Sequence, residues 1–260
     1  MIDALQRGLA LKEKIRAGEP TLGLFVRTPA PHVIEVLASS GLDFVGLDAE
    51  HAPFDIAALD ACIFAARAVG LPALVRVPER APARILSVLD MGGAGIIAPH
   101  VTTASEATEV IAATRYVGGT RGFSGSHRAA GYGVLAPRDY KERSDRAVIV
   151  VGQVEDAAAV DNIDELASMD NLDALFIGRA DLANSLGVDS TAAVEVERAV
   201  DRLCEGARNG GRTMGMFLPS TAEVETFRAK GVSLFIVDTD QALLAKAARS
   251  TVQDFKTKCR

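Results

Sequence analysis

The stretch AVIVVGQVE, residues 147–155, is apolar over its first half and becomes polar at Gln153 and Glu155. Continuous apolar strands of this kind are typical of a sheet that is covered on both faces. Similar β-rich runs recur along the chain, and most are separated by helix-like segments. The sequence predicts eight strands, at Thr21–Val26, Phe44–Glu50, Ala73–Pro78, Gly95–Val101, Ala147–Glu155, Ala174–Asp181, Thr213–Pro219 and Leu234–Asp240.

Alanine-rich amphipathic segments lie between most of these strands. Strand–helix alternation predicts parallel βαβ units. Eight such units in 260 residues match the count and size of a TIM barrel. We expect helices at Asp55–Val69, Ala81–Met91, Ala104–Arg115, Ala157–Met169, Ala192–Asn209 and Thr221–Lys230.

Residues 1–20, MIDALQRGLALKEKIRAGEP, have the pattern of an amphipathic helix and lack the apolar core of a secretory signal. We therefore expect a single α/β domain over residues 1–260, a (β/α)8 TIM barrel with an N-terminal helix. An open doubly wound sheet is the alternative. No GxGxxG or Walker sequence follows the first predicted strand, which disfavours the phosphate-binding versions of that fold.

The composition restricts the partners and the compartment. A net charge of -6 argues against nucleic acid or an anionic membrane surface as the main partner. No apolar run approaches the length of a membrane span. The cysteines Cys62, Cys204 and Cys259 form no CxxC pair, so we expect reduced thiols in a cytoplasmic protein and no cysteine-rich metal site.

A glycine-rich segment, Tyr116 to Gly133 (YVGGTRGFSGSHRAAGYG), interrupts the alternation. Long irregular segments inside compact domains are uncommon and are usually functional or mobile. The alternative is a flexible surface loop.

Polar and ionisable residues gather where the predicted strands end. In a TIM barrel, catalytic residues lie at the C-terminal ends of the strands. If these strands form one barrel, the side chains converge on one mouth. They are Asp48, Glu50, His51, Arg76, His100, Gln153, Glu155, Arg179 and Asp181.

Glu155 and Asp181 end neighbouring predicted strands. Two carboxylates suit a hard divalent cation, Mg²⁺ or Mn²⁺, which keeps several positions for water and substrate oxygens. Arg76 could hold a developing oxyanion, and His51 could move a proton near neutral pH. None of the seven lysines falls at a predicted strand end, which argues against a Schiff-base mechanism. The set therefore indicates metal-dependent enolate chemistry on an oxo acid.

Several motifs in order resemble the HpcH/HpaI family of metal-dependent (class II) pyruvate aldolases. DAEHAPFD resembles the family's D-G-E-H-A-P-x-D signature, and further segments resemble its motifs from Gly23 to about Leu244. The match is specific because the whole set appears in order. The further segments are LVRVPERAP, LDMGGAGIIAPHVTTASEA, RYVGGTRGFSGSHRAAGYG, VGQVED and FIGRADLANSLG.

The resemblance implies a (β/α)8 barrel, usually a homohexamer, with aldol or retro-aldol activity on 2-oxo acids. It implies a metal held by Glu155 and Asp181, with Co²⁺ as a third candidate beside Mg²⁺ and Mn²⁺. It also implies that His51 is the base. The remaining roles it implies are enolate stabilisation by Arg76, an increase in the basicity of His51 by Asp90, a place near the base for Asp48, and contacts of Gln153 and Ala180 with the pyruvyl group.

Three positions depart from the family pattern. Arg179 replaces the proline of G-P-A-D, Phe25 stands where the family has a tryptophan, and His100 stands at a commonly apolar position. We include Arg179, Phe25 and the ligand Asp181 among the substrate-binding residues. Arg179 could pair with a second carboxylate on the acceptor side. It could also weaken the metal site by repulsion, or point away.

The function expected from the sequence is metal-dependent cleavage of a 4-hydroxy-2-oxo acid into pyruvate, or a close 2-oxo acid, and an aldehyde. One alternative is an acyl-CoA lyase of the citryl/malyl-CoA lyase group. Another is a non-catalytic barrel that binds an oxo acid.

Overall fold

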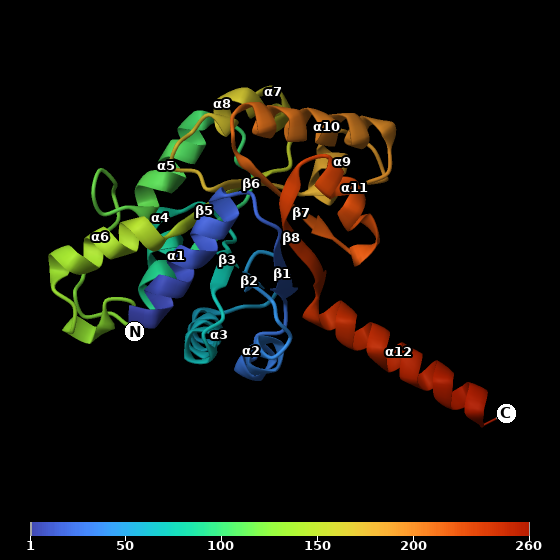
Figure 1. Ribbon diagram of the computed structural model, residues 1–260, viewed down its shortest axis with the longest axis horizontal. Coiled ribbons are helices and arrows are strands. Elements are labelled where there is room, and N and C mark those ends of the chain that lie inside the picture. The colour runs from blue at the N-terminus through green and yellow to red at the C-terminus, as the bar shows by residue number, and fades with distance from the viewer. Residues whose placement is uncertain (1, 260) are drawn as a thin grey trace.

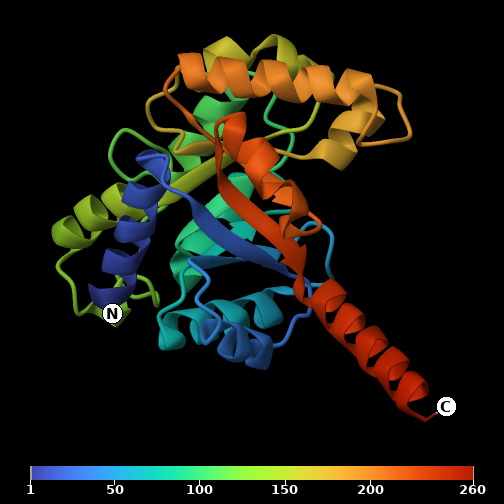
Figure 2. The same ribbon diagram turned by 45° about the vertical axis from the view of Figure 1, so that its right-hand side comes forward.

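In the computed structural model, which describes residues 2–259, eight parallel strands close into a barrel in chain order. Figure 1 labels the strands, and Figure 2 gives a second view of the same ribbon. The predicted fold class is therefore confirmed. The strands are β1 (Thr21–Val26), β2 (Phe44–Asp48), β3 (Ala73–Arg76), β4 (Gly95–Ala98), β5 (Ile149–Val154), β6 (Ala174–Ile177), β7 (Thr213–Leu218) and β8 (Val232–Thr239).

Helices surround the barrel and connect most of its strands (Figure 1). The predicted helix at Ala157–Met169 is two short helices, α7 (Ala157–Asp161) and α8 (Ile163–Ala167). The others are α1 (Ile2–Arg16), α2 (Pro31–Ala38), α3 (Ile56–Val69), α4 (Pro82–Met91), α5 (Ala104–Thr114), α6 (Pro137–Ala147), α9 (Arg179–Ser185), α10 (Val194–Asn209), α11 (Val224–Ala229) and α12 (Asp240–Lys258), with 3-10 turns η1 (Gly131–Gly133) and η2 (Thr221–Glu223).

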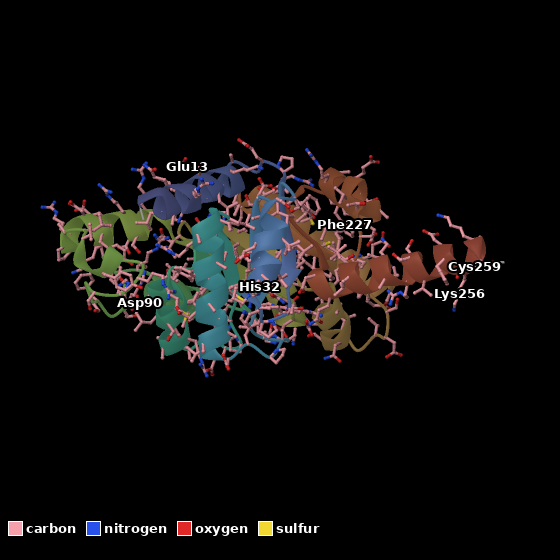
Figure 3. All side chains as sticks on the ribbon, turned by 90° about the horizontal axis from the view of Figure 1, so that it is seen from below. Glu13, His32, Asp90, Phe227, Lys256 and Cys259 are labelled. Atoms are coloured by element: carbon pink, nitrogen blue, oxygen red, sulfur yellow. The ribbon has the colours of Figure 1, made fainter. Side chains whose placement is uncertain are left out.

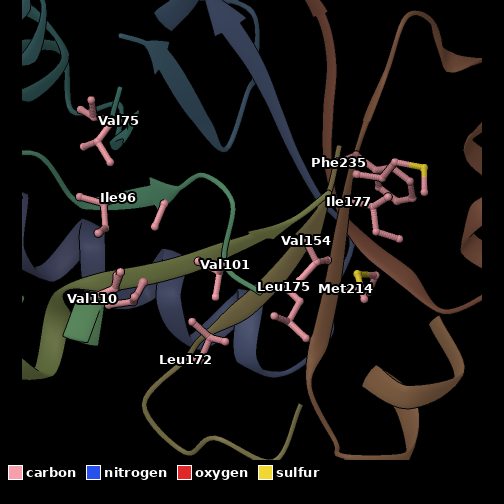
Figure 4. Packing of buried hydrophobic residues seen from close by; sticks show 14 of the residues in the cluster. Val75, Ile96, Val101, Val110, Val154, Leu172, Leu175, Ile177, Met214 and Phe235 are labelled. Carbon is pink, nitrogen blue, oxygen red and sulfur yellow. The ribbon is translucent and has the colours of Figure 1, made fainter. Parts of the chain in front are cut away.

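Alternate residues of the strands build two separate layers of core, because successive strand side chains point to opposite faces. One layer lies between barrel and helices and includes Val75, Ile96, Leu175 and Met214 (Figure 4). The other is a separate cluster that fills the barrel and contains Phe25, Phe44, Leu74, Ile97, Ile149, Val151, Ala174, Phe176, Leu234 and Ile236. The barrel interior is thus packed, and a site can form only at an end.

Helix α1 packs against one end of the barrel. Its Leu11 and Ile15 belong to the inner cluster. Lys12 donates to the carbonyl of Val148 at 2.6 Å, just before β5, and Thr213 at the start of β7 donates to the carbonyl of Ile15 at 2.6 Å. These contacts are at the N-terminal ends of the strands, so the opposite, C-terminal end remains as the mouth.

Helix α12 extends away from the barrel in both ribbon views (Figure 1, Figure 2). None of its described residues is buried. Its exposed large apolar side chains are Leu243, Leu244, Val252 and Phe255. No helix within residues 2–259 is long and apolar enough to cross a membrane.

Candidate active site

Asp48 is the last residue of β2, is fully buried, and lies opposite Arg76 of β3 in the sheet register. Arg76 grips the carboxylate with two bonds, from Nε to Oδ1 at 3.0 Å and from an Nη to Oδ2 at 2.8 Å. The backbone N–H of His51 also donates to Oδ1, at 3.1 Å. Burial alone would raise the pKa of Asp48, but the bonds from Arg76 outweigh it, and the pKa is lowered.

The guanidinium of Arg76 stacks over the ring of Phe25 of β1. The central carbon of the guanidinium lies 4.6 Å from the ring centroid. Phe25 also contacts the rings of Phe176 and Phe217, and only 2% of it is exposed. The ring therefore supports Arg76. Its predicted contact with substrate stays a prediction.

Glu50 and His51 follow Asp48 on the turn after β2. The Glu50 carboxylate lies 3.3 Å from Nε of Arg76 and 3.6 Å from Nε2 of His51, whose side chain is half exposed. Burial raises the pKa of Glu50, although Arg76 and His51 oppose this. One Glu50 oxygen is buried without a hydrogen-bond partner among the described residues. The sequence places Glu50 at this strand end but does not indicate a role for it.

Arg27, directly after β1, is a second guanidinium at this position that sequence reasoning missed. Its Nε donates to Oδ2 of Asp48 at 2.7 Å, the same oxygen that Arg76 uses. The only sequence signal was an arginine at the end of a predicted strand.

Glu155 follows β5 and is 1% exposed. It accepts from the backbone N–H of His100 at 3.0 Å and from the side-chain amide of Gln153. Burial raises the pKa of Glu155, and the charge of Asp181 adds to the increase, while the two hydrogen bonds oppose it. A Cβ at Gly178, just after β6, would run into the carboxylate of Glu155 and the amide of Gln153, so a larger residue there would displace these two groups.

These residues fit a divalent cation with oxygen ligands. Glu155 and Asp181 repel each other, and the buried Oε1 of Gln153 has no hydrogen-bond partner among residues 2–259. A cation would relieve the repulsion and give oxygen atoms of this kind a partner. No cluster of three or more His, Cys, Asp or Glu side chains suited to a metal occurs in the part of the chain that the structure describes. Two protein carboxylates match the sparse ligand set that Mg²⁺ uses beside water and substrate.

His100 connects the two halves of the mouth. Its Nδ1 lies 3.0 Å from Asp156 and 3.5 Å from Glu155, and its charge also interacts with Glu50. Its backbone is left-handed, with φ of 51°. The groups after β2 and after β5 therefore belong to one site.

Arg179 does not enter this set of contacts. Its two terminal nitrogens donate to the two carboxylate oxygens of Glu223, both at 2.9 Å, and its guanidinium lies 4.8 Å from the ring centroid of Phe227. Ala180 is exposed beside it, at the start of α9, and Asp181 is partly exposed. The structure thus favours the last of the three alternatives for Arg179, in which it points away from Glu155 and Asp181.

Asp90 lies at the last turn of α4, far along the helix from the end of β3, and Figure 3 shows it to one side of the molecule. It pairs with Arg121 at 2.8 Å and with His127 at 3.4 Å, both from the glycine-rich segment. No contact described within the chain joins it to His51, so its predicted effect on that base stays a prediction. The segment itself is anchored through these pairs.

Known proteins resemble this chain over nearly its full length. It is 31% identical to 5-keto-4-deoxy-D-glucarate aldolase of Klebsiella pneumoniae over 247 residues, 94% of this chain and 96% of the relative. The crystal structure of an HpcH/HpaI aldolase/citrate lyase family protein from Burkholderia cenocepacia is 33% identical, with a TM-score of 0.90 over 95% of this chain and 99% of that one. The crystal structure of citrate synthase SbnG is 30% identical, with a TM-score of 0.86 over 96% and 98% of the two chains.

A model of the HpcH/HpaI aldolase/citrate lyase family matches residues 21–247, which run from the first residue of β1 into α12. The matched span includes every strand and every residue of the mouth. The chain therefore belongs to the HpcH/HpaI aldolase/citrate lyase family and is a carbon–carbon lyase.

Proposed function

We propose that this enzyme is a metal-dependent aldolase that cleaves a 4-hydroxy-2-oxo acid into pyruvate, or a close 2-oxo acid, and an aldehyde. The observation that carries the proposal is the buried Glu155 after β5, fixed by the backbone N–H of His100 and by the amide of Gln153, whose buried Oε1 has no partner among the described residues. The relative from Klebsiella is named for cleavage of 5-keto-4-deoxy-D-glucarate, which supports the reaction class.

Glu155 and Asp181 would hold the metal, with Mg²⁺ or Mn²⁺ preferred and Co²⁺ as a third candidate. When bound, such an ion acts as a Lewis acid that polarises a carbonyl oxygen. Gln153, whose Oε1 is buried without a partner among the described residues, and the exposed Ala180 would contact the pyruvyl part.

The groups after β2 would carry the proton and the charge. The imidazole of His51 would accept the proton of the 4-hydroxyl group, directly or through a water, as the C3–C4 bond breaks and the aldehyde forms. C3 of the enolate would then take up a proton to give pyruvate. Arg76 keeps one terminal nitrogen without a hydrogen bond to any described residue, and this nitrogen would donate to the enolate oxygen. Asp48 and Phe25 hold the guanidinium in place for this contact.

The proposal is tested by measuring pyruvate release from a panel of 4-hydroxy-2-oxo acids, with and without EDTA. We expect release that EDTA abolishes and Mg²⁺ or Mn²⁺ restores. Release that is indifferent to chelation would contradict the metal's role. Thioester cleavage in the same panel would support the acyl-CoA lyase alternative, and oxo-acid binding without turnover would support the non-catalytic one.

We also propose that the enzyme is a cytoplasmic homo-oligomer, a hexamer by resemblance to the family. The exposed apolar side chains on α12 support association, because an isolated helix of this kind leaves apolar area in water. The three free cysteines are consistent with a reducing compartment.

A further inference from the structure

Two arginines at the mouth, Arg179 and Arg80, have a carboxylate or carbonyl for each terminal nitrogen. Arg179 is held by Glu223 through both. Arg80 uses one on the carbonyl of His100 and the other on Glu106. The sequence suggested Arg179 as the cation for a second substrate carboxylate, and its bidentate pair with Glu223 disfavours that role.

Arg27 is different, because hydrogen bonds hold its backbone and its Nε but not its two terminal nitrogens. Its backbone N–H donates to Asp240 at 2.8 Å, and the next N–H, of Thr28, donates to the same carboxylate at 3.2 Å. Its Nε is bound to Asp48. Neither terminal nitrogen has a hydrogen bond to any residue between 2 and 259, and 34% of the side chain is exposed.

The position of the Arg27 terminal nitrogens relative to the reacting atoms follows from Asp48, the partner that Arg27 shares with Arg76. Arg27 and Arg76 donate to the same carboxylate oxygen, so their guanidinium groups are neighbours at the mouth. Arg76 is the group that would hold the enolate oxygen. A charged group that reached Arg27 would therefore sit a few bonds further along the substrate, on the aldehyde portion.

We propose that Arg27 binds a second carboxylate, carried by the aldehyde portion, and so selects dicarboxylic aldols; this rests on the proposed aldolase function. A guanidinium presents two parallel N–H donors that match a carboxylate, and such charge-assisted pairs are strong when the donor is fixed in advance. Arg76 faces the carboxylates of both Asp48 and Glu50, whereas Arg27 shares only Asp48, through its Nε. The two terminal nitrogens of Arg27 are therefore left to bind an anionic ligand.

The test uses two ligands that cannot be cleaved because they lack the 4-hydroxyl group. The first, 2-oxoglutarate, has a distal carboxylate, and the second, 2-oxopentanoate, has the same number of carbons without it. Their dissociation constants are measured by calorimetry in saturating Mg²⁺. We expect wild type to bind 2-oxoglutarate roughly 10- to 100-fold more tightly, the usual range for a hydrogen bond to a charged group.

Substitution then assigns the preference to Arg27. In Arg27→Met the ratio of the two constants should fall toward one, and Arg27→Lys should keep part of it. Arg84→Met removes the same charge from an exposed arginine at the start of α4 and should keep the wild-type ratio. If Arg27 only positioned Arg76 through Asp48, both ligands would weaken equally and the ratio would persist, which would overturn the proposal.

Failure of this proposal is separable from failure of the aldolase assignment. Wild type is also assayed for pyruvate release from 4-hydroxy-2-oxopentanoate, whose tail is uncharged, and from 4-hydroxy-2-oxoglutarate. Pyruvate release together with a binding ratio near one would refute the role of Arg27 and leave the aldolase assignment in place. No release from either compound would refute the aldolase assignment, and the role of Arg27 with it.

Discussion

Asp48 organises the site at the scale of single residues. Its carboxylate accepts four hydrogen bonds, from Arg76, Arg27 and the backbone of His51, in a fully buried position. A buried charge of this kind is tolerated only when it is paired and hydrogen-bonded. The residue therefore positions two guanidinium groups and the start of the His51 turn at once.

Asp48→Asn should lower the free energy of unfolding by roughly 3–5 kcal/mol at pH 7, because it leaves a buried arginine without its charge partner. The pKa of Asp48 is lowered in the folded protein. Its contribution to stability is thus present above its ordinary value near 3.8 and is lost as the pH falls through the lower folded value. Urea unfolding at several pH values checks this. A penalty that stays constant down to acidic pH would contradict it.

The positions of the candidate site residues could be predicted from sequence better than their contacts. Asp48 and Arg76 end strands, Gln153 lies in the last two residues of β5 and Glu155 follows it, and strand ends meet in any closed parallel barrel. The partner of Arg179 could not be foreseen, because Glu223 is 44 positions away on another loop. The same holds for Arg27, whose Asp48 and Asp240 contacts depend on how three loops meet.

At the scale of elements, the loop between β4 and α5 shows how a strand end is fixed. Thr103 caps α5, and Glu106 returns its carboxylate to the backbone N–H groups of Thr102 and Thr103 in a capping box. Arg80 binds the same carboxylate and also the carbonyl of His100. The capping box therefore holds the residue that contacts Glu155.

Glu106→Ala should destabilise the fold by roughly 1–3 kcal/mol, since it removes the acceptor of several bonds to a charged group. The hydrogen bond from Arg80 lowers the pKa of Glu106 to about 2. The penalty should be full above its ordinary value of 4.5 and should disappear as the pH falls toward about 2. Thermal unfolding of this variant and of Glu109→Ala, which changes an exposed glutamate on the same helix, provides the comparison. Equal losses in both variants would refute the capping role.

Several strands and helices differ in their boundaries from those that the sequence predicts. Strands β2, β3, β4 and β6 stop two to four residues before their predicted ends. The residues that follow β2, β3 and β4 leave the sheet, and Arg179 to Asp181, which were predicted in the strand of β6, begin helix α9. Helices α2, α6, α9 and α12 lie outside the helices that the sequence predicts. Only one residue of α2 is buried and none of α12, so neither helix has a continuous apolar face toward the core.

At the scale of the whole molecule, α12 is the part that the barrel leaves uncovered. It begins with Thr239 as its cap, and its Asp240 fixes the backbone of Arg27, so its start belongs to the mouth. Its far end lies well away from the rest of the chain, as the positions of Lys256 and Cys259 in Figure 3 show. A second copy of the chain is the partner that would bury its apolar residues in the proposed oligomer.

Leu244→Asp with Phe255→Asp should lower the molar mass measured by light scattering after size exclusion, because two charges would enter the buried contact. Gln253→Asp adds a charge at an exposed position of the same helix and serves as the control. An unchanged mass in the double variant would show that α12 does not hold the oligomer together.

The metal pair is the central claim, and a titration of Mn²⁺ into the apo-enzyme tests it most directly. Calorimetry in the presence of pyruvate should give one site per chain in wild type and in Asp189→Asn, an exposed aspartate after α9. Glu155→Ala and Asp181→Ala should each weaken binding by at least about a hundredfold, or roughly 2.7 kcal/mol. Wild-type affinity in both variants would contradict the account.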